Sequence, residues 1–199
     1  MRSGAPVLGR AADLADTAAH PALVDEARAA LGGLDTVLVA HGELGVQTEA
    51  QRTYDATLPL LATNFLSPVS LLTRLANDFE AQGHGCLAVI TSVAGDRGRQ
   101  SNYVYGAAKG ALSLFLGGLR NRLAPKGVSV VDMKLGFVDT PMTAAHRKGP
   151  LWASPEQVAR RIVRAIDRGE DVVYAPWFWC WIMLIIRNIP ERIFKRLKL

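Results

Sequence analysis

Three short, continuous apolar runs constrain the fold of this chain most. They occupy residues 35–40 (DTVLVA), 86–91 (CLAVIT) and 128–133 (VSVVDM), and each follows a helical pattern and a turn that contains glycine. A strand that is apolar on both faces is typical of a parallel sheet with helices on either side. The alternation therefore predicts an α/β fold with a doubly wound parallel sheet.

The remaining elements follow from the same pattern. We expect helices over 17–31, 53–81, 103–123 and 155–168, and a last short strand over 171–174. In a sheet of this kind, ligands bind beyond the carboxyl ends of the strands. The loops that start at Ala40, Ser92 and Leu135 each begin where a predicted strand stops, so we expect them to surround a binding site.

Composition narrows the class of protein further. With 199 residues, 49% of them hydrophobic and 21% charged, the chain has enough apolar material for one packed core. Its two cysteines, Cys86 and Cys180, are far apart, which favours a reducing, cytoplasmic compartment over a disulfide framework. His41 and His146 lack a partner at ligand spacing, so we predict that the protein binds no metal.

The distribution of charge bears on the partners of the protein. The formal net charge is +5, but residues 187–199 hold five basic residues against one acid, so the rest of the chain is nearly neutral. A nucleic-acid-binding domain spreads its basic residues over a face of the fold. We therefore expect no nucleic-acid partner.

Four polar residues are the strongest candidates for chemistry. Tyr105 and Lys109 stand four apart at the start of a predicted helix, so their side chains share one face. Ser92 ends the preceding strand, and Asn64 interrupts an apolar helix, where an amide is costly without partners. Taken singly, each has an ordinary structural interpretation, such as a solvated helix face, a turn cap or a satisfied polar group at a kink.

Together the four residues describe one reaction. A phenol is a poor proton donor at neutral pH, and we expect the ammonium of Lys109 to lower the pKa of Tyr105 so that it serves as a general acid or base. Ser92 can hold a carbonyl or alcohol oxygen, and Asn64 can anchor a water that relays protons. This set suits the interconversion of a ketone and a secondary alcohol, for which a cofactor must carry the hydride.

In order and approximate spacing, these four residues resemble the catalytic tetrad of the short-chain dehydrogenase/reductase family. Three further segments are similar to cofactor-binding parts of that family: Asp13-Leu14 to its adenine-contacting acid, LVAHG at 38–42 to its NNAG-like loop, and LGFVDT at 135–140 to its PG-x-V-x-T segment. The resemblance implies a Rossmann-like fold, NAD or NADP as cofactor, and catalytic roles for Asn64, Ser92, Tyr105 and Lys109. It also implies cofactor contacts from Asp13, Leu14, Ala40, His41, Gly42, Tyr105, Lys109, Gly136, Val138 and Thr140.

One part of the family pattern is missing from the printed sequence. The family begins with a strand and a G-x-x-x-G-x-G turn that approaches the cofactor pyrophosphate, and Gly4 and Gly9 have the wrong spacing for it. We interpret 7–12 as the family's third strand, so that the first two strands are lacking, and we expect Met1 to lie inside a longer natural protein. The alternative is a real short form with impaired cofactor binding, acting as a membrane-associated partner protein.

The resemblance also bears on the substrate. The segments 91–112 and 172–199 look like those of the reductase subunits of decaprenylphosphoryl-ribose 2-epimerases, which reduce a lipid-linked 2-keto sugar. This implies a lipid-linked or other small carbonyl substrate. Residues 141–153 stand where the family has a mobile lid, and His146 and Trp152 are candidates for substrate contact.

Residues 175–199 follow the predicted partial domain (1–174) as a segment that is not an independent domain. Residues 175–186 carry no charge but are too few to span a bilayer. After them, Ile189, Ile193 and Leu197 share a helical face, and Arg192, Lys195, Arg196 and Lys198 point elsewhere. Two interpretations stay open and are compatible: contact with the inner face of the cell membrane, or a subunit contact in a homo-oligomer.

Overall fold

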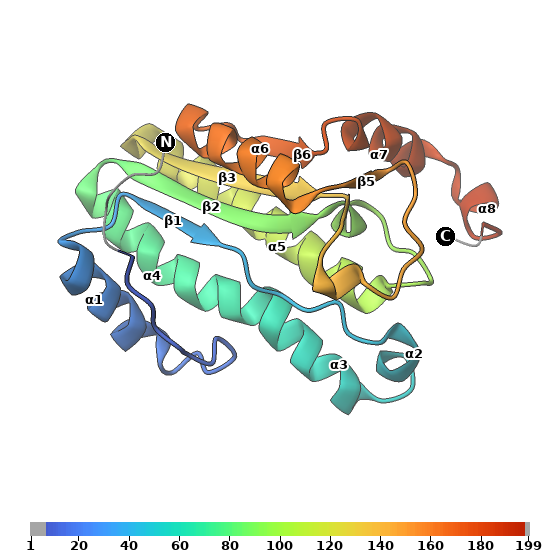
Figure 1. Ribbon diagram of the computed structural model, residues 1–199, viewed down its shortest axis with the longest axis horizontal. Coiled ribbons are helices and arrows are strands. Elements are labelled where there is room, and N and C mark those ends of the chain that lie inside the picture. Colours follow the sequence, from blue (N-terminus) through green and yellow to red (C-terminus); the bar gives the residue numbers. More distant parts are fainter. Residues whose placement is uncertain (1–6, 198–199) are drawn as a thin grey trace.

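A four-stranded parallel sheet forms the centre of the protein (Figure 1). This computed structural model describes residues 7–197. The strands are β1 (Thr36–Val39), β2 (Gly85–Ser92), β3 (Val128–Leu135) and β6 (Val172–Ala175). They lie in the order β1-β2-β3-β6, and every pair is parallel, which confirms the predicted α/β sheet and its four expected strands.

Helices cover both faces of this sheet (Figure 1). On one face lie α4 (Ser67–Gln82) and α5 (Tyr103–Leu123), with α1 (His20–Leu31) packed against α4, and on the other lies α6 (Pro155–Arg168). Each face buries its own apolar cluster. Leu75, Phe79 and Leu116 belong to the first, and Met133 and Ile162 to the second.

Local sequence sets the ends of α6. The side chain of Ser154 accepts a hydrogen bond from the backbone N–H of Gln157, whose own side chain accepts one from the N–H of Ser154. This capping box is followed by Pro155 at the first position and ended by Gly169, whose φ of 59° is left-handed. The predicted helices over 155–168 and 103–123 are both confirmed.

Two expectations for the N-terminal part are wrong. Residues 7–12 form no strand and lie exposed without a sheet neighbour, since a strand needs a partner along its whole backbone. The first helix starts at His20 rather than at 17, because the carboxylates of Asp13 and Asp16 accept hydrogen bonds from backbone N–H groups two residues on and hold this stretch in turns.

The long helix predicted over 53–81 is present with an interruption. A π-helical turn, η1 (Ala62–Leu66), joins α3 (Tyr54–Leu61) to α4 and carries Asn64. Turns of this kind are frequent at functional sites. The continuous helix Tyr54–Gln82 is long and apolar enough to cross a membrane by length and composition alone, but its residues Leu72 and Phe79 are buried in the protein core.

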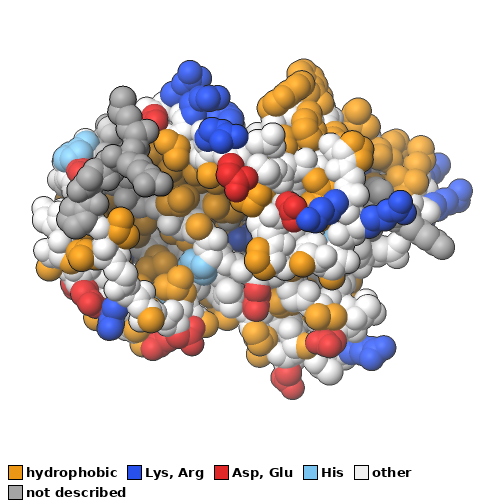
Figure 2. Space-filling model, viewed as in Figure 1, with side chains coloured by type: hydrophobic (Ala, Val, Ile, Leu, Met, Phe, Trp, Pro, Cys, Tyr) orange, Lys and Arg blue, Asp and Glu red, His pale blue; other side chains and the backbone are white. Residues whose placement is uncertain are grey.

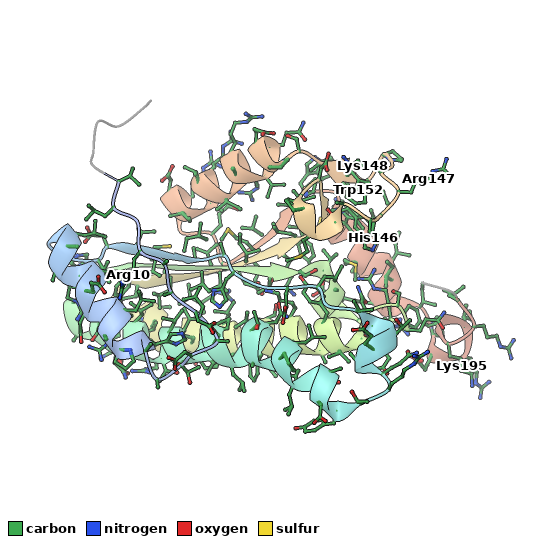
Figure 3. All side chains as sticks on the ribbon, turned by 60° about the horizontal axis from the view of Figure 1, so that its bottom comes forward. Arg10, His146, Arg147, Lys148, Trp152 and Lys195 are labelled. Carbon is green, nitrogen blue, oxygen red and sulfur yellow. The ribbon has the colours of Figure 1, made fainter. Side chains whose placement is uncertain are left out.

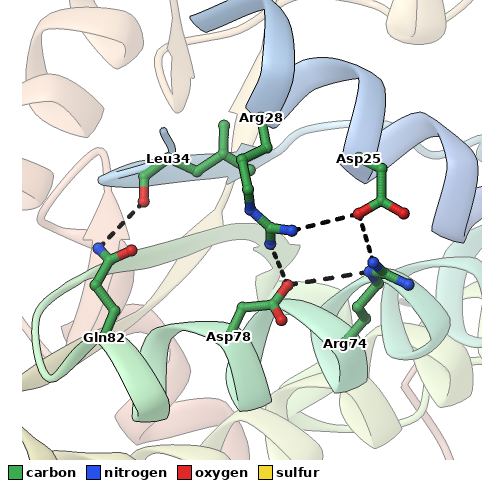
Figure 4. Close-up of polar contacts among 6 residues, drawn as sticks. All are labelled: Asp25, Arg28, Leu34, Arg74, Asp78 and Gln82. Carbon is green, nitrogen blue, oxygen red and sulfur yellow. Dashed lines mark hydrogen bonds and ion pairs between the residues drawn. The ribbon is translucent and has the colours of Figure 1, made fainter. Parts of the chain in front are cut away.

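Charged side chains fix α1 on α4, as Figure 4 shows. Arg28 pairs with Asp25 at 3.3 Å and with Asp78, and Arg74 reaches Asp25 at 2.5 Å. At the end of α4, the side chain of Gln82 donates a hydrogen bond to the carbonyl oxygen of Leu34 at 3.3 Å. Pairs as exposed as these contribute about 0–1 kcal/mol each, so they orient α1 more than they stabilise it.

Several short elements were not indicated by the sequence pattern, and the helix expected around residues 189–197 is formed only over Glu191–Phe194. Two-residue strands β4 and β5 pair beside the main sheet, and two helices form the C-terminal segment. The short elements are α2 (Gln47–Ala50), η2 (Val93–Asp96), η3 (Ala124–Lys126), β4 (Phe137–Val138), η4 (Pro141–Thr143), β5 (Trp152–Ala153), α7 (Trp179–Asn188) and α8 (Glu191–Phe194). Lys198, which the sequence analysis placed on the basic side of this segment, lies outside the described residues.

Candidate active site

A cavity of about 360 Å³ opens at the carboxyl ends of β1, β2 and β3. Ser92, Tyr105 and Lys109 reach its wall from two different elements, β2 and α5. Most of the other predicted site residues also line it, namely Ala40, His41, Gly42, Gly136, Val138, Thr140 and His146. The loops that follow β1, β2 and β3 therefore line one cavity, and their role in binding stays a prediction.

Four predicted residues do not line the cavity: Asp13, Leu14, Trp152 and Asn64, which is buried behind the loop after β1. Asp13 and Leu14 do not line this cavity but precede α1, where the carbonyl oxygen of Leu14 is hydrogen-bonded to the ring of His20 at 3.1 Å. Their contact with adenine stays a prediction. Trp152 lines a neighbouring groove and stacks on Phe137, with ring centroids 5.3 Å apart, so it reaches the cavity only through that ring.

Glycines hold Tyr105 and Lys109 close to Ser92. A Cβ on Gly106 would lie 2.8 Å from the carbonyl oxygen of Ala94, and one on Gly110 would lie 2.7 Å from that of Gly95. The backbone of α5 therefore touches the backbone of η2, which directly follows Ser92. This close approach needs residues without side chains.

Asn64 organises the loop after β1. It is fully buried, and its amide donates hydrogen bonds to the carbonyl oxygens of Glu43 at 2.8 Å and Leu60 at 3.0 Å, while its Oδ1 accepts one from the N–H of Glu43 at 3.2 Å. A Cβ on Gly42 would lie 2.8 Å from Oδ1 of Asn64 and 3.1 Å from Nζ of Lys109. Asn64 and Lys109 thus both meet the backbone of Gly42.

Lys109 carries a buried ammonium. Its side chain is 3% exposed, and Nζ donates a hydrogen bond to the carbonyl oxygen of Ile90 at 3.2 Å. Burial lowers the pKa of Lys109 to about 8, although the carboxylate of Asp132 opposes this shift. Asp132 is itself buried in β3 and accepts a hydrogen bond from the hydroxyl of Thr91.

The phenol of Tyr105 differs from its expected state. Burial raises the pKa of Tyr105 above its ordinary value, and the Ser92 hydroxyl opposes the shift only in part. The ring centroid lies 6.0 Å from Nζ of Lys109. The expected lowering of the Tyr105 pKa by Lys109 is therefore not found, because burial dominates and the opposing effect comes from the Ser92 hydroxyl. Tyr105 is a protonated group that can donate.

Loop residues complete the wall. Nε2 of His41 lies 2.8 Å from Oγ of Ser67, and burial, with a smaller contribution from Lys109, lowers the pKa of His41 so that it is neutral at pH 7. Thr140 and Thr143 form a capping box, and the hydroxyl of Thr143 donates to the carbonyl oxygen of Val138 at 2.6 Å. These contacts fix the course of the 136–143 loop past the cavity.

Two cavity residues with unpartnered buried polar atoms were missed in the sequence analysis. Arg99 and Asn102 line the wall next to Ser92, and within residues 7–197 the buried Nε of Arg99 and Oδ1 of Asn102 have no hydrogen-bond partner. Burial lowers the pKa of Arg99, with Asp96 acting in the opposite direction. Their position between Ser92 and Tyr105 was the available signal, since that loop had to cross the mouth of the site.

Comparison with known proteins identifies the family. Residues 2–150 match the sequence profile of the short chain dehydrogenases. An uncharacterized oxidoreductase of Mycobacterium tuberculosis (strain ATCC 25618 / H37Rv) is 37% identical over 185 residues, which cover 93% of this chain and 74% of that protein. The chain belongs to the short-chain dehydrogenase/reductase family. It is therefore an oxidoreductase.

Other similar proteins agree with this assignment. An uncharacterized oxidoreductase of Streptomyces coelicolor is 33% identical over 186 residues, covering 93% of this chain and 73% of that protein. A solved structure of a candidate gluconate dehydrogenase from Agrobacterium tumefaciens has a TM-score of 0.72 at 15% identity and covers 82% of this short-chain dehydrogenase/reductase and 72% of the other chain. At that identity the match supports the fold alone.

The residues present fit the nicotinamide-ribose half of the cofactor that this family generally binds. Gly42 lines the cavity beside the buried ammonium of Lys109 and the neutral imidazole of His41, and the hydroxyl-bearing loop at Thr140 lines the same space. Lys109, Tyr105 and the 40–42 loop would hold that half. In the described part of the chain, no group of three or more His, Cys, Asp or Glu side chains converges as a metal site would, and the absence of a metal stays a prediction.

Proposed function

We propose that this short-chain dehydrogenase/reductase reduces a ketone to a secondary alcohol, with NADH or NADPH as the hydride donor. The observation that carries the proposal is the convergence of Ser92, Tyr105 and Lys109 on one cavity wall, although they come from different elements. Asn64 supports the same wall from the π-helical turn. A bound reduced nicotinamide would supply the hydride, which no side chain can provide.

The side chains of this site would then act on the carbonyl oxygen. Tyr105, kept protonated by its raised pKa, donates its phenolic proton to that oxygen as negative charge develops on it. Ser92 donates a hydrogen bond to the same oxygen. Lys109, charged below a pH of about 8, stabilises the phenolate left after the transfer. Asn64 orders the loop at Glu43 and would anchor the return of a proton from solvent.

For the substrate, we propose a lipid-linked keto sugar. The lining combines many apolar side chains with the unpartnered polar atoms of Arg99 and Asn102, which suits a polyhydroxylated or anionic head on an apolar carrier. His146 in the lid segment is a further candidate contact. The resemblance of the 91–112 and 172–199 segments to reductases of lipid-linked keto sugars supports the same choice. We also propose that the protein forms a homo-oligomer and is located in the cytoplasm.

A second candidate function is a non-catalytic partner protein bound to a membrane. The observation that favours it is the C-terminal segment, where Trp177, Trp181 and Ile185 are exposed. A partner protein of this kind would bind neither NADH nor NADPH. Cofactor binding therefore separates the two candidates before any substrate is known.

The experiment measures cofactor binding and turnover in matched variants. Transfer of excitation energy from tryptophan to reduced nicotinamide reports binding, and oxidation of NADH or NADPH with ketones, including a polyprenylphosphoryl keto sugar, reports turnover. We expect Tyr105→Phe to bind the cofactor and to lose turnover by about a hundredfold or more. Tyr103→Phe, two residues away and exposed on the same helix, should keep full activity. If Tyr105→Phe keeps most of the rate, the assignment of Tyr105 is wrong.

A further inference from the structure

The C-terminal segment presents an apolar face that nothing in the described chain covers. In α7, Trp179 and Met183 are buried against Val93 of η2, and the opposite side of the helix is exposed. Trp177, Trp181 and Ile185, spaced four apart, are 68%, 60% and 67% exposed. Within α7 the four-residue spacing places Trp181 and Ile185 on one side of the helix, and Trp177 lies in the turn that precedes it. We call the exposed apolar side chains of the C-terminal segment the docking face; they are Trp177, Trp181, Leu184, Ile185, Ile193 and Leu197.

Basic side chains border this docking face on two sides. Figure 2 shows hydrophobic side chains gathered over α7, with Lys and Arg side chains over α6 on one side and around the C-terminal end on the other. On α6, Arg160 and Arg164 line a groove of about 540 Å³ together with Trp177. The exposed cations on the C-terminal side are Arg187, Arg192, Lys195 and Arg196.

We propose that the docking face binds the surface of an anionic lipid bilayer. Tryptophan and aliphatic side chains between cations match the boundary between acyl chains and negatively charged headgroups. A symmetric contact between two copies of the chain would bring the same basic rims together, and like charges would repel. Charge complementarity therefore favours the lipid surface over a second copy.

Contacts of Arg97 attach the C-terminal helices, which carry the docking face, to the rest of the protein. The guanidinium of Arg97 donates hydrogen bonds to the carbonyl oxygens of Ile186 at 2.6 Å and Ile189 at 2.7 Å, and it pairs with Glu191 at 2.9 Å. It also lies 3.6 Å from the centre of the Phe194 ring. One arginine thus fastens the end of α7 and the whole of α8 to the loop after η2. A preorganised face loses little conformational entropy on binding.

The same segment touches the wall of the active-site cavity. A Cβ on Gly136 would lie 1.9 Å from the indole nitrogen of Trp179, and the ring of Phe137 meets the Trp179 ring edge-on at 5.3 Å. Figure 3 shows His146, Arg147, Lys148 and Trp152 grouped at the end of the molecule that carries the C-terminal helices, with Arg10 at the opposite end. A bilayer on the docking face would therefore lie close to the lid segment.

The experiment is vesicle flotation with the full chain. Vesicles of phosphatidylcholine alone are compared with vesicles of phosphatidylcholine and phosphatidylglycerol. We expect binding to the anionic vesicles, weakened about tenfold or more when Trp181→Ser and Ile185→Ser are combined, because two interfacial apolar anchors are lost. Leu114→Ser, at a comparably exposed position on α5, is the matched control and should bind like the unchanged protein.

Charge is tested by a second matched pair. Lys195→Gln with Arg196→Gln should weaken binding several-fold at low salt, with the difference disappearing at high salt. Arg52→Gln with Lys126→Gln removes the same charge at exposed sites elsewhere and should leave binding unchanged. Because this assay uses no cofactor or ketone, its result does not depend on the proposed reductase activity.

A variant with conservative substitutions tests the same face without disturbing the fold. Brominated lipid should quench tryptophan fluorescence of the bound protein, and Trp177→Phe with Trp181→Phe should remove most of that quenching while keeping the apolar face. The proposal is overturned if the chain does not bind anionic vesicles. It is also overturned if Trp181→Ser combined with Ile185→Ser leaves vesicle binding unchanged. It is equally overturned if those substitutions convert a dimer to a monomer without changing vesicle binding, since the face would then join two copies.

Discussion

The Nζ of Lys109 donates a hydrogen bond to the backbone carbonyl oxygen of Ile90, the residue two before Ser92 on β2. This contact holds the ammonium against the part of the cavity wall that Ile90 forms. Tyr105 lies on the same face of α5 as Lys109. The position is electrostatically unfavourable, because a buried ammonium loses hydration. Its protonation should therefore govern the pH range of the enzyme.

We expect ketone reduction to decline as the pH rises through about 8, the pKa to which burial lowers Lys109. Tyr105 does not cause the decline, because its pKa is raised. Between a pH of about 8 and the ordinary lysine value of 10.5, the unfolded chain binds more protons at this position than the folded chain. The contribution of Lys109 to the free energy of unfolding thus increases with pH over that range, so unfolding at this group cannot explain the decline. Rate and denaturant midpoint measured across the same pH series check both signs.

Asp132→Asn should shift the decline in ketone reduction at high pH to a lower pH. The carboxylate of Asp132 raises the pKa of Lys109, and an asparagine oxygen can still accept the hydrogen bond from Thr91. The fold is therefore kept while the opposing charge is removed. Asp139→Asn removes an exposed carboxylate that pairs with Lys148 and should leave the profile unchanged. If the rate of Asp132→Asn declines at the same pH as that of the unchanged protein, the electrostatic account is contradicted.

Gly110→Ala should destabilise the protein by about 1–3 kcal/mol and lower the rate, because the added methyl meets the carbonyl oxygen of Gly95 at 2.7 Å. The overlap pushes α5 away from η2 and separates Tyr105 from Ser92. Gly118→Ala, on the same helix with open space around it, should stabilise by about 0.5–1 kcal/mol. Chemical denaturation of the two variants measures both values, and equal effects would contradict the close-approach interpretation.

Arg99→Met should raise KM for a ketone with a polar or anionic head and change kcat little. The unpartnered Nε of Arg99 lines the cavity without being one of the groups assigned to proton transfer. An interaction made equally in the bound substrate and the transition state affects KM alone. Steady-state kinetics with a charged and an uncharged ketone measure this. A fall in kcat with unchanged KM would contradict the role.

Arg97→Ala should loosen the C-terminal segment and destabilise the protein by about 1.5–3 kcal/mol, the usual range for hydrogen bonds from a charged group. Limited proteolysis should then cut between α7 and α8. Arg122→Ala, which removes an exposed arginine paired with Glu80, should cost only about 0–1 kcal/mol. If both variants are equally protease-resistant, the fastening role of Arg97 is wrong.

Much of the fold could be predicted from the sequence, because a buried strand or helix has a recognisable local pattern of apolar residues. The apolar runs that became β1, β2, β3 and β6 were recognisable one strand at a time, and the helix ends at Ser154 and Gly169 follow from capping. The segment 7–12 was misassigned because a strand is defined by its neighbour, which a short apolar pattern does not reveal. The π-helical turn at Asn64 likewise depends on tertiary contacts with Glu43.

The candidate site was predictable to a different degree. Residue type and spacing were enough to select Ser92, Tyr105 and Lys109, and the structure brings them to one cavity. The raised pKa of Tyr105 was not predictable, since burial is a property of the assembled fold. The contacts of Arg97 join positions about 90 residues apart in the chain and leave no local pattern.

The most direct test of the reductase account follows the hydride itself. The chain is incubated with a ketone and a reduced nicotinamide that carries deuterium at the transferred position, and the alcohol is analysed by mass spectrometry. The account predicts one deuterium on the carbinol carbon with the unchanged protein and with Tyr103→Phe, and none above background with Tyr105→Phe. Deuterium transfer that persists undiminished in Tyr105→Phe would contradict the central claim.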